Sequence, residues 1–328
     1  VRIVVTGGAG YVGSACLRHL AAHGHEVLAY DNLTEGHRAA LAGAAFVEGD
    51  IADSGRLAGL LGDFRADAVL HFAAATYVGR SVSDPAFYYQ NNVSGTLSLL
   101  NALRTANVRR LLFSSTCATY GLAPECPMSE EAPQDPCSPY ARTKLAVEWM
   151  IRDFSTAYGL GFTLLRYFNA AGASADGAHG EDHRPETHLI PLVLQVPLGR
   201  RDRMKVFGDD YPTPDGTCIR DYVHVADLAS AHLLAIEATQ PEAGEVYNVG
   251  TGTGSSVLEV ISACAEVTTC EIPLERVERR PGDAPALVAD PSKLRDRLGW
   301  EPRYTAIDEI VASAWRWHRS HPDGYADS

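Results

Sequence analysis

The first thirteen residues, Val1 to Gly13, read VRIVVTGGAGYVG, so a short β-branched run passes directly into a cluster of glycines. This order is typical of a buried strand that ends in a tight turn and opens a helix. Glycines have no Cβ and let a pyrophosphate approach the backbone N–H groups at the helix N-terminus. The run fits GxGxxG from Gly8 or GxxGxxG from Gly7, but an ordinary glycine-rich turn gives the same letters.

Short apolar segments alternate with helical ones beyond this turn. A helix is expected from about Tyr11 to His23 and a second strand from Glu26 to Tyr30, with Gly24 as the stop between them. Further buried strands are expected at residues 45–47, 68–72, 110–114 and 162–167. The alternation predicts an α/β fold of the Rossmann type, with a doubly wound parallel sheet.

Two long helices and a change of composition organise the rest of the chain. The helices are expected at about residues 84–105 and 140–158, the second with Ser138 as its N-cap and Pro139 in its first position. Residues 170–187 lose periodicity, which indicates a crossing from a dinucleotide-binding domain, residues 1–169, into a smaller C-terminal α/β substrate lobe, residues 170–328. This boundary is approximate, because the chain can return from the second part to the first. Within the second part, residues 209–216 resemble a hairpin.

The composition narrows the class of protein. The 328 residues include 28 Lys and Arg against 41 Asp and Glu, and a net charge of −13 opposes binding to nucleic acid or anionic lipid. No export signal or apolar run of membrane-spanning length is found. The seven cysteines are scattered and never spaced as CxxC, which argues against a disulfide framework and a zinc site. We therefore expect a cytoplasmic protein with no metal.

Asp31 strengthens the dinucleotide interpretation, because it ends the second expected strand about twenty residues after the glycines. A carboxylate at this place accepts hydrogen bonds from an adenosine ribose and repels a 2′-phosphate, which favours NAD over NADP. The alternative role for Asp31 is that of a turn or cap residue beside Asn32.

Three residues form the candidate catalytic group. Tyr140 and Lys144 stand at i and i+4, hence on one face of a helix. A phenol has a pKa of about 10, but Lys⁺ and the positive nicotinamide both favour a phenolate that takes a proton from a substrate hydroxyl. Thr116 ends the strand before that helix, where its hydroxyl can meet the same substrate oxygen, unless it only satisfies a turn. The pattern YxxxK is common on ordinary helices. It indicates a catalytic pair here only because it follows a nucleotide-binding half of the chain.

Longer motifs follow in order along the chain. They include HFAA (71–74), NNVSGT (91–96), SSTCATYG (114–121), SPYARTK (138–144), RYFNAAG (166–172) and FGDDYPTPDGTCIRDYVHV (207–225). With these motifs the chain resembles the UDP-glucose 4-epimerase family of the extended short-chain dehydrogenases over essentially its whole length. The later motifs are far more specific than the glycine turn.

The resemblance implies two sets of binding residues beside the catalytic Thr116, Tyr140 and Lys144. The NAD set is Gly7, Gly10, Tyr11, Val12, Gly13, Asp31, Asn32, Asp50, Ile51, Phe72, Ala73, Ala74, Asn91, Ser114, Tyr140, Lys144 and Tyr167. The UDP-sugar set is Thr116, Tyr140, Asn169, His188, Leu189, Phe207, Arg220, Tyr222, Arg280, Asp283 and Leu287. Arg220 and Arg280 are the donors a diphosphate needs in an acidic protein, although a surface ion pair is the usual fate of an Arg.

The implied reaction interconverts UDP-galactose and UDP-glucose through a transient 4-keto sugar and bound NADH. The family also implies a homodimer formed by the two long helices. Dehydratases of the same superfamily carry an Asp-Glu pair after the catalytic Thr, whereas Cys117 and Ala118 follow Thr116 here. A 4,6-dehydratase, a decarboxylase or a non-catalytic nucleotide-sensing protein remain the alternatives.

Several positions depart from familiar members of this family. Thr76 replaces a common Lys, Arg80 a common Glu, His188 a common Asn, and Thr116 the more usual Ser. Leu287 occupies a position that the family uses to wall the sugar pocket, often with Tyr. Because Leu leaves more room, we expect some tolerance of UDP-N-acetylhexosamines.

Overall fold

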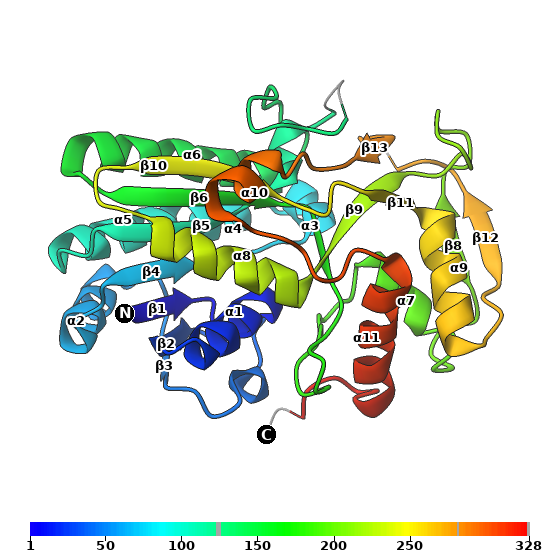
Figure 1. The fold of residues 1–328 in the computed structure, drawn as a ribbon, viewed down its shortest axis with the longest axis horizontal. Coiled ribbons are helices and arrows are strands. Elements are labelled where there is room, and N and C mark those ends of the chain that lie inside the picture. Colours follow the sequence, from blue (N-terminus) through cyan, green and yellow to red (C-terminus); the bar gives the residue numbers. More distant parts are fainter. Residues whose placement is uncertain (123–125, 281, 327–328) are drawn as a thin grey trace.

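Seven parallel strands form the central sheet of the computed structural model, which describes residues 1–122, 126–280 and 282–326 (Figure 1). The strand order is β10-β6-β5-β4-β1-β2-β3. In chain order the strands are β1 (Arg2–Thr6), β2 (Glu26–Asp31), β3 (Phe46–Glu48), β4 (Ala68–His71), β5 (Arg110–Thr116), β6 (Gly161–Tyr167) and β10 (Gly244–Val249). The direction of winding reverses between β1 and β4, which places a ligand crevice at the carboxyl ends of these strands. The predicted Rossmann-type class is confirmed.

Helices cover both faces of this sheet. One face carries α1 (Tyr11–Ala22) against α8 (Val225–Ala238), in a core with the apolar side chains of β1. The other face carries α2 (Ser54–Phe64), α5 (Gly95–Thr105) and α6 (Pro139–Tyr158), packed over Val4, Val69 and Phe113. Both faces are buried, so the strands are nearly continuous apolar runs.

Both predicted long helices are confirmed. The first consists of α4 (Pro85–Tyr88), a π-helical turn η2 (Tyr89–Ser94) and α5, and follows the short α3 (Val78–Ser83). The second is α6, whose N-cap Ser138 accepts a hydrogen bond of 3.2 Å from the backbone N–H of Ala141. Pro139 stands in its first turn, where no backbone donor is needed.

A smaller lobe lies beside the carboxyl edge of the sheet (Figure 1). Its strand β9 pairs with β7, β11 and β13, while β8 pairs with β12. The strands are β7 (Asn169–Ala171), β8 (Met204–Phe207), β9 (Ile219–His224), β11 (Gly254–Ser256), β12 (Leu274–Val277) and β13 (Ala286–Leu287). Its helices are α7 (Leu189–Leu194), α9 (Val257–Thr268) and α11 (Ile307–Ser320), whereas α10 (Ser292–Leu298) packs on α8 and β10 of the larger part.

The chain passes between the two parts more than once. After β9 it returns through α8 to β10, which pairs in parallel with β6 at the edge of the large sheet. The hairpin expected at residues 209–216 is wrong, because the flanking strands β8 and β9 pair with other strands rather than with each other. Among the described residues, no helix has the length and apolar character needed to cross a bilayer.

Candidate active site

The glycines between β1 and α1 have different roles. Gly7 has a φ of +72°, and a Cβ there would lie 2.4 Å from the backbone nitrogen of Ala73. A Cβ on Gly13 would lie 2.1 Å from the carbonyl oxygen of Gly7. Around Gly10, by contrast, the nearest described atom to a built Cβ, apart from the adjoining residues, is the Gly7 oxygen, at 3.4 Å. Gly7 and Gly13 therefore allow the turn to close, and Gly10 leaves the N-terminus of α1 open, as a pyrophosphate requires.

Two carboxylates and an amide meet beyond this turn, at the ends of β2 and β3. Asp31 accepts hydrogen bonds from the backbone N–H groups of Ala9 (3.0 Å) and Leu33 (2.8 Å). Asn32 donates to Asp50 at 2.9 Å. Burial raises the pKa of Asp31, and its backbone donors oppose that rise. Asp31 thus stabilises a local turn, which was the alternative role expected for it. Its carboxylate also lies beside the glycine loop.

Ile51 and the residues after β4 line the neighbouring part of the crevice. Ile51 is buried against Gly95, the first residue of α5. Phe72 and Ala73 donate backbone hydrogen bonds to Thr6, which holds the segment up to Ala74 against the glycine turn.

Asn91, a predicted NAD residue, donates to the buried Asn92, which the sequence analysis did not single out. Asn92 receives a backbone hydrogen bond from Ala75 and donates one back to it, at 2.8 Å and 3.0 Å. It also donates to the hydroxyl of Thr143 on α6 at 3.0 Å. Asn92 therefore ties the segment after β4 to the helix that carries Tyr140. Its place in the NNVSGT motif is the only sequence signal that could have indicated it.

Lys144 and Tyr167 both contact the end of β5. The amino group of Lys144 donates to the carbonyl oxygen of Ser114 at 2.8 Å, and the Tyr167 hydroxyl lies 2.6 Å from the Ser114 hydroxyl. Burial lowers the pKa of Lys144 to about 7 and raises that of Tyr167 to about 12. The structure brings these three predicted residues together at the carboxyl end of β5.

Tyr140 lies in the first turn of α6, beside Thr116. Burial raises the pKa of the Tyr140 phenol above its ordinary value, and interaction with the Thr116 hydroxyl favours the phenolate. Thr116 also caps the short 3-10 helix η3 (Cys117–Tyr120) by accepting a hydrogen bond of 3.2 Å from Ala118. The hydroxyl thus serves a turn and also contacts the candidate base.

A buried ion pair lies behind this group and was missed by the sequence analysis. Glu148 on α6 accepts two hydrogen bonds from the guanidinium of Arg166, at 2.9 Å and 2.6 Å, and one of 2.5 Å from Ser115. Both charged side chains are almost fully buried. Glu148 follows Lys144 by one helical turn and opposes the lowering of its pKa by burial. Only the i, i+4 spacing from Lys144 and the place of Arg166 in RYFNAAG signal this pair.

The small lobe presents Arg220 next to Asp283. The guanidinium donates to Asp283 at 3.1 Å and to the carbonyl oxygens of Ile219 and Ala284 at 2.8 Å and 2.9 Å. Leu287 is opposite Arg220 in the β13–β9 pairing and packs in an apolar cluster with Cys117, the residue after Thr116. The Arg220 end of the lobe therefore adjoins the catalytic group.

The other predicted substrate residues lie on neighbouring elements. Asn169 is opposite the buried Tyr222 in the β7–β9 pairing. Arg280 lies over the ring of Phe207, with its Cζ 3.8 Å from the ring centroid.

His188 is the N-cap residue of α7, and Leu189 begins that helix in the core that also contains Tyr222. Two of the other positions that differ from familiar family members are Thr76 and Arg80. Thr76 is exposed, and Arg80 forms an ion pair of 3.6 Å with Glu35.

The sequence is similar to proteins of a known enzyme family over most of its length. A sequence model of the NAD dependent epimerase/dehydratase family matches residues 3–250. The chain belongs to this family. It is 49% identical to a UDP-glucose 4-epimerase of Halalkalibacterium halodurans over 99% of this chain and 97% of the relative.

Solved structures of the family superpose on the whole chain. The UDP-glucose 4-epimerase of Brucella ovis in complex with NAD has a TM-score of 0.92 and 47% identity, covering 96% of this chain and 97% of that one. The Bifidobacterium longum enzyme in complex with NAD+ and UDP has a TM-score of 0.95 and 38% identity, covering 99% and 100%. The resemblance to UDP-glucose 4-epimerases is confirmed.

Proposed function

We propose that the protein interconverts UDP-galactose and UDP-glucose by NAD-dependent epimerisation at C4. The observation that supports this proposal most is the grouping of Thr116, Tyr140 and Lys144 at the carboxyl end of β5, with Arg220 near the adjacent Cys117. A base, a hydrogen-bond donor and a cation thus face the crevice where a dinucleotide and a nucleotide sugar would meet.

The glycine turn, Asp31 and the residues after β4 fit a dinucleotide, since Gly10 leaves room at the N-terminus of α1 and Asp31 offers a carboxylate to a ribose. When bound there, NAD supplies a hydride acceptor and returns the hydride, so the sugar passes through a 4-keto form. Tyr140 removes the C4 hydroxyl proton and later returns it to the same oxygen, after the keto sugar has turned its opposite face toward the nicotinamide. Thr116 orients the same oxygen by hydrogen bonding.

Tyr140 needs positive charge to act as a base, because burial alone raises the pKa of its phenol. Lys144 lies one turn further along α6, and its position is fixed by the hydrogen bond to Ser114. We assign to Lys144 the tasks of favouring the phenolate and of binding the nicotinamide ribose.

Arg220 and Arg280 hold the substrate diphosphate. The Arg220 guanidinium is oriented in advance by Asp283 and two carbonyl oxygens, so little side-chain freedom is lost on binding. Cys117 and Ala118 after Thr116 leave the place of the dehydratase carboxylates without a charge, which favours epimerisation over the alternatives.

The side chain of Leu287 gives the sugar pocket its width. Because Leu is shorter than the Tyr found at this position in part of the family, UDP-N-acetylhexosamines also fit. This tolerance depends on Leu287 packing beside Cys117, close to the reacting end of the sugar.

The protein forms a homodimer through α5 and α6. Large apolar side chains are exposed on and beside these helices: Tyr89 (43%), Leu97 (41%), Trp149 (60%) and Tyr158 (49%). Such a group of exposed apolar residues is typical of an interface. Light scattering at micromolar concentration tests this, with a dimer expected for the wild type and a monomer for Trp149→Glu.

All seven cysteines are free thiols, which fits the reducing cytoplasm.

An end-point assay tests the proposed reaction. Purified protein is incubated with UDP-galactose, and the UDP-sugars are separated by chromatography. Formation of UDP-glucose is expected, and Tyr140→Phe should slow it by about 100-fold or more. Tyr304→Phe, which removes a phenol outside the site, is the matched control. UDP-galactose left unchanged by the wild-type protein would contradict the proposal.

A further inference from the structure

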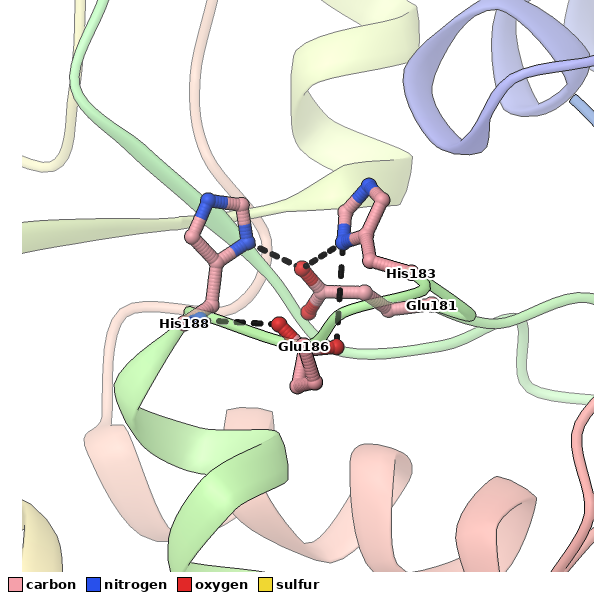
Figure 2. Close-up of side chains that lie close together, drawn as sticks. All are labelled: Glu181, His183, Glu186 and His188. Atoms are coloured by element: carbon pink, nitrogen blue, oxygen red, sulfur yellow. Dashed lines mark hydrogen bonds and ion pairs between the residues drawn. The ribbon is translucent and has the colours of Figure 1, made fainter. Parts of the chain in front are cut away.

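Four side chains of metal-ligand type converge in the loop before α7. Glu181, His183, Glu186 and His188 each offer one ligand atom, and these atoms all lie within 4.8 Å of one another (Figure 2). They come from eight consecutive residues with the pattern E-x-H-x-x-E-x-H. This pattern contains no cysteine, and the prediction of no metal rested on the spacing of the cysteines.

The ligand atoms face a common point. Nδ1 of His183 lies 3.1 Å from Oε1 of Glu181 and 3.7 Å from Oε2 of Glu186. Nδ1 of His188 contacts the same Glu181 oxygen. Figure 2 shows both imidazole rings turned toward the Glu181 carboxylate. The Glu181 and Glu186 side chains are only 3% and 9% exposed, so water solvates these carboxylates poorly.

His183 carries a buried nitrogen that is not satisfied by hydrogen bonding. Its Nδ1 has two carboxylate oxygens nearby, but it forms no hydrogen bond of acceptable geometry within the described part of the chain. A buried polar atom without a hydrogen bond is uncommon in native proteins. A cation at the common point would satisfy this nitrogen and both carboxylates together.

Neighbouring groups leave the inward atoms available. Oε1 of Glu186 accepts backbone hydrogen bonds from Thr187 (2.6 Å) and His188 (2.8 Å), which leaves Oε2 to face His183. The His183 ring lies edge-on to the rings of Tyr11 and Tyr77. Such outer contacts orient metal ligands in known sites.

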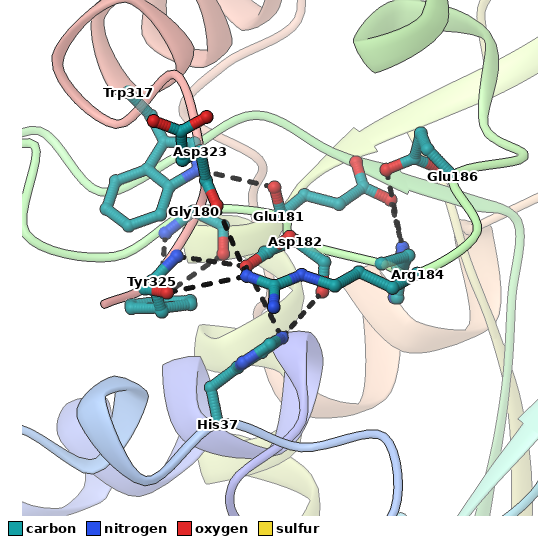
Figure 3. A network of polar contacts seen from close by, with 10 residues as sticks. His37, Gly180, Glu181, Asp182, Arg184, Glu186, Trp317, Asp323 and Tyr325 are labelled. Carbon is teal, nitrogen blue, oxygen red and sulfur yellow. Dashed lines mark hydrogen bonds and ion pairs between the residues drawn. The ribbon is translucent and has the colours of Figure 1, made fainter. Parts of the chain in front are cut away.

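Helix α11 and the C-terminal tail hold the backbone of this loop (Figure 3). The indole N–H of Trp317 donates to the carbonyl oxygen of Glu181 at 3.3 Å, and the backbone N–H of Tyr325 donates to Asp182 at 2.9 Å. Arg184 donates both to Asp182 and to the carbonyl oxygen of Asp323, at 3.1 Å and 3.2 Å. The backbone of the ligand loop is therefore held by α11 and the residues that follow it.

We infer that Glu181, His183, Glu186 and His188 bind one divalent first-row transition-metal ion, with Zn²⁺ as the expected occupant. Two neutral imidazoles and two carboxylates balance the charge of a divalent ion and suit Zn²⁺, which takes four nitrogen or oxygen ligands at about 2.0–2.2 Å. The ion has a structural role: it fixes residues 181–188 and the position of His188 at the start of α7. It takes no part in the epimerisation chemistry proposed above.

Two protonated imidazoles would also balance the two carboxylates, without any ion. Metal binding separates these two arrangements, and it can be measured independently of enzymatic activity. Untagged protein is treated with a chelator, desalted and titrated with Zn²⁺ by calorimetry, and its metal content is determined by mass spectrometry. Co²⁺ is a spectroscopic probe, because its visible absorption reports four-coordinate nitrogen and oxygen ligation.

About one ion per chain is expected for the wild type. His183→Ala and Glu186→Gln should each weaken Zn²⁺ binding more than about 10-fold. His23→Ala, which removes an exposed histidine elsewhere, should bind as the wild type does. Added Zn²⁺ should raise the Tm of the wild type but not that of His183→Ala.

The inference is overturned if the chelated wild type takes up no more Zn²⁺ than an equal amount of an unrelated protein. It is also overturned if Glu186→Gln and His183→Ala, shown to be folded by circular dichroism, bind Zn²⁺ with wild-type affinity.

Discussion

The amino group of Lys144 donates a hydrogen bond of 2.8 Å to the carbonyl oxygen of Ser114 in a buried part of the site. Burial lowers the pKa of Lys144 from 10.5 to about 7, although Glu148 opposes the change. Between these two pH values the unfolded chain binds more protons than the folded chain. The contribution of Lys144 to stability is therefore least favourable below about pH 7 and improves as the pH rises toward 10.5.

Replacing Lys144 with Met should therefore have an effect on stability that depends on pH. The variant loses the hydrogen bond to Ser114 at every pH but avoids burying a charge at low pH. We expect its Tm relative to the wild type to be more favourable near pH 6 than near pH 10. Scanning fluorimetry measures this, with Lys205→Met on the exposed face of β8 as the control. A Tm difference that is the same at both pH values would contradict the prediction.

Removing one charge of the Glu148–Arg166 pair should lower the free energy of unfolding strongly, whereas replacing both charged residues by apolar ones should lower it much less. Glu148→Gln leaves the Arg166 guanidinium buried without its counter-charge, and we expect a loss of about 3–5 kcal/mol in the free energy of unfolding. The double variant Glu148→Leu with Arg166→Met removes both charges and should recover much of that loss. Urea unfolding gives both values. A Glu148→Gln effect below about 1 kcal/mol, as for a surface pair, would show that this pair is not isolated from water.

Gly7 and Gly10 should respond differently to the same methyl group. Gly7→Ala places a Cβ 2.4 Å from Ala73 in a backbone with φ of +72°, so the turn must shift and the Tm should fall. Gly10→Ala meets only a contact of 3.4 Å, so it should leave the Tm nearly unchanged while weakening NAD binding about 10-fold or more. Calorimetry with NAD tests the difference. Equal losses of Tm in both variants would refute the separate roles.

Leu287→Tyr should narrow the sugar pocket. We expect the variant to retain turnover of UDP-galactose but to lose most of its turnover of UDP-N-acetylglucosamine. The ratio of kcat/KM for the two substrates measures the change, with Leu287→Met as a control that preserves side-chain volume. If the ratio stays constant in Leu287→Tyr, residue 287 does not set the width of the pocket.

The large sheet was predictable because each strand carries its own apolar run and each crossover its own helical pattern. Ser138, Pro139 and the spacing of Tyr140 and Lys144 are local signals, so the start of α6 was also predicted correctly. The prediction of a hairpin at residues 209–216 was wrong, because the partner of β8 is β12, which lies about seventy residues further along the chain. Turn residues indicate where a strand ends, but not which strand lies beside it.

The parts of the site that the sequence analysis missed depend on the tertiary fold. Glu148 and Arg166 lie on different elements and meet only when α6 packs on β6. Asn92 connects the segment after β4 to α6, and neither partner is near it in sequence. The ligands at residues 181–188 are close in sequence, but the loop that carries them is held by α11, whose Trp317 lies more than 130 residues beyond Glu181.

The return of the chain through α8 to β10 affects how the protein folds as it leaves the ribosome. Until residue 249 has emerged, β6 is an edge strand whose backbone has no pairing partner on the side that β10 later occupies. The N-terminal half therefore cannot reach its final form before half of the small lobe's own strands have been synthesised. Nascent chains that stall between residues 170 and 240 would present that edge to one another, and chaperone capture is most needed in this interval of translation.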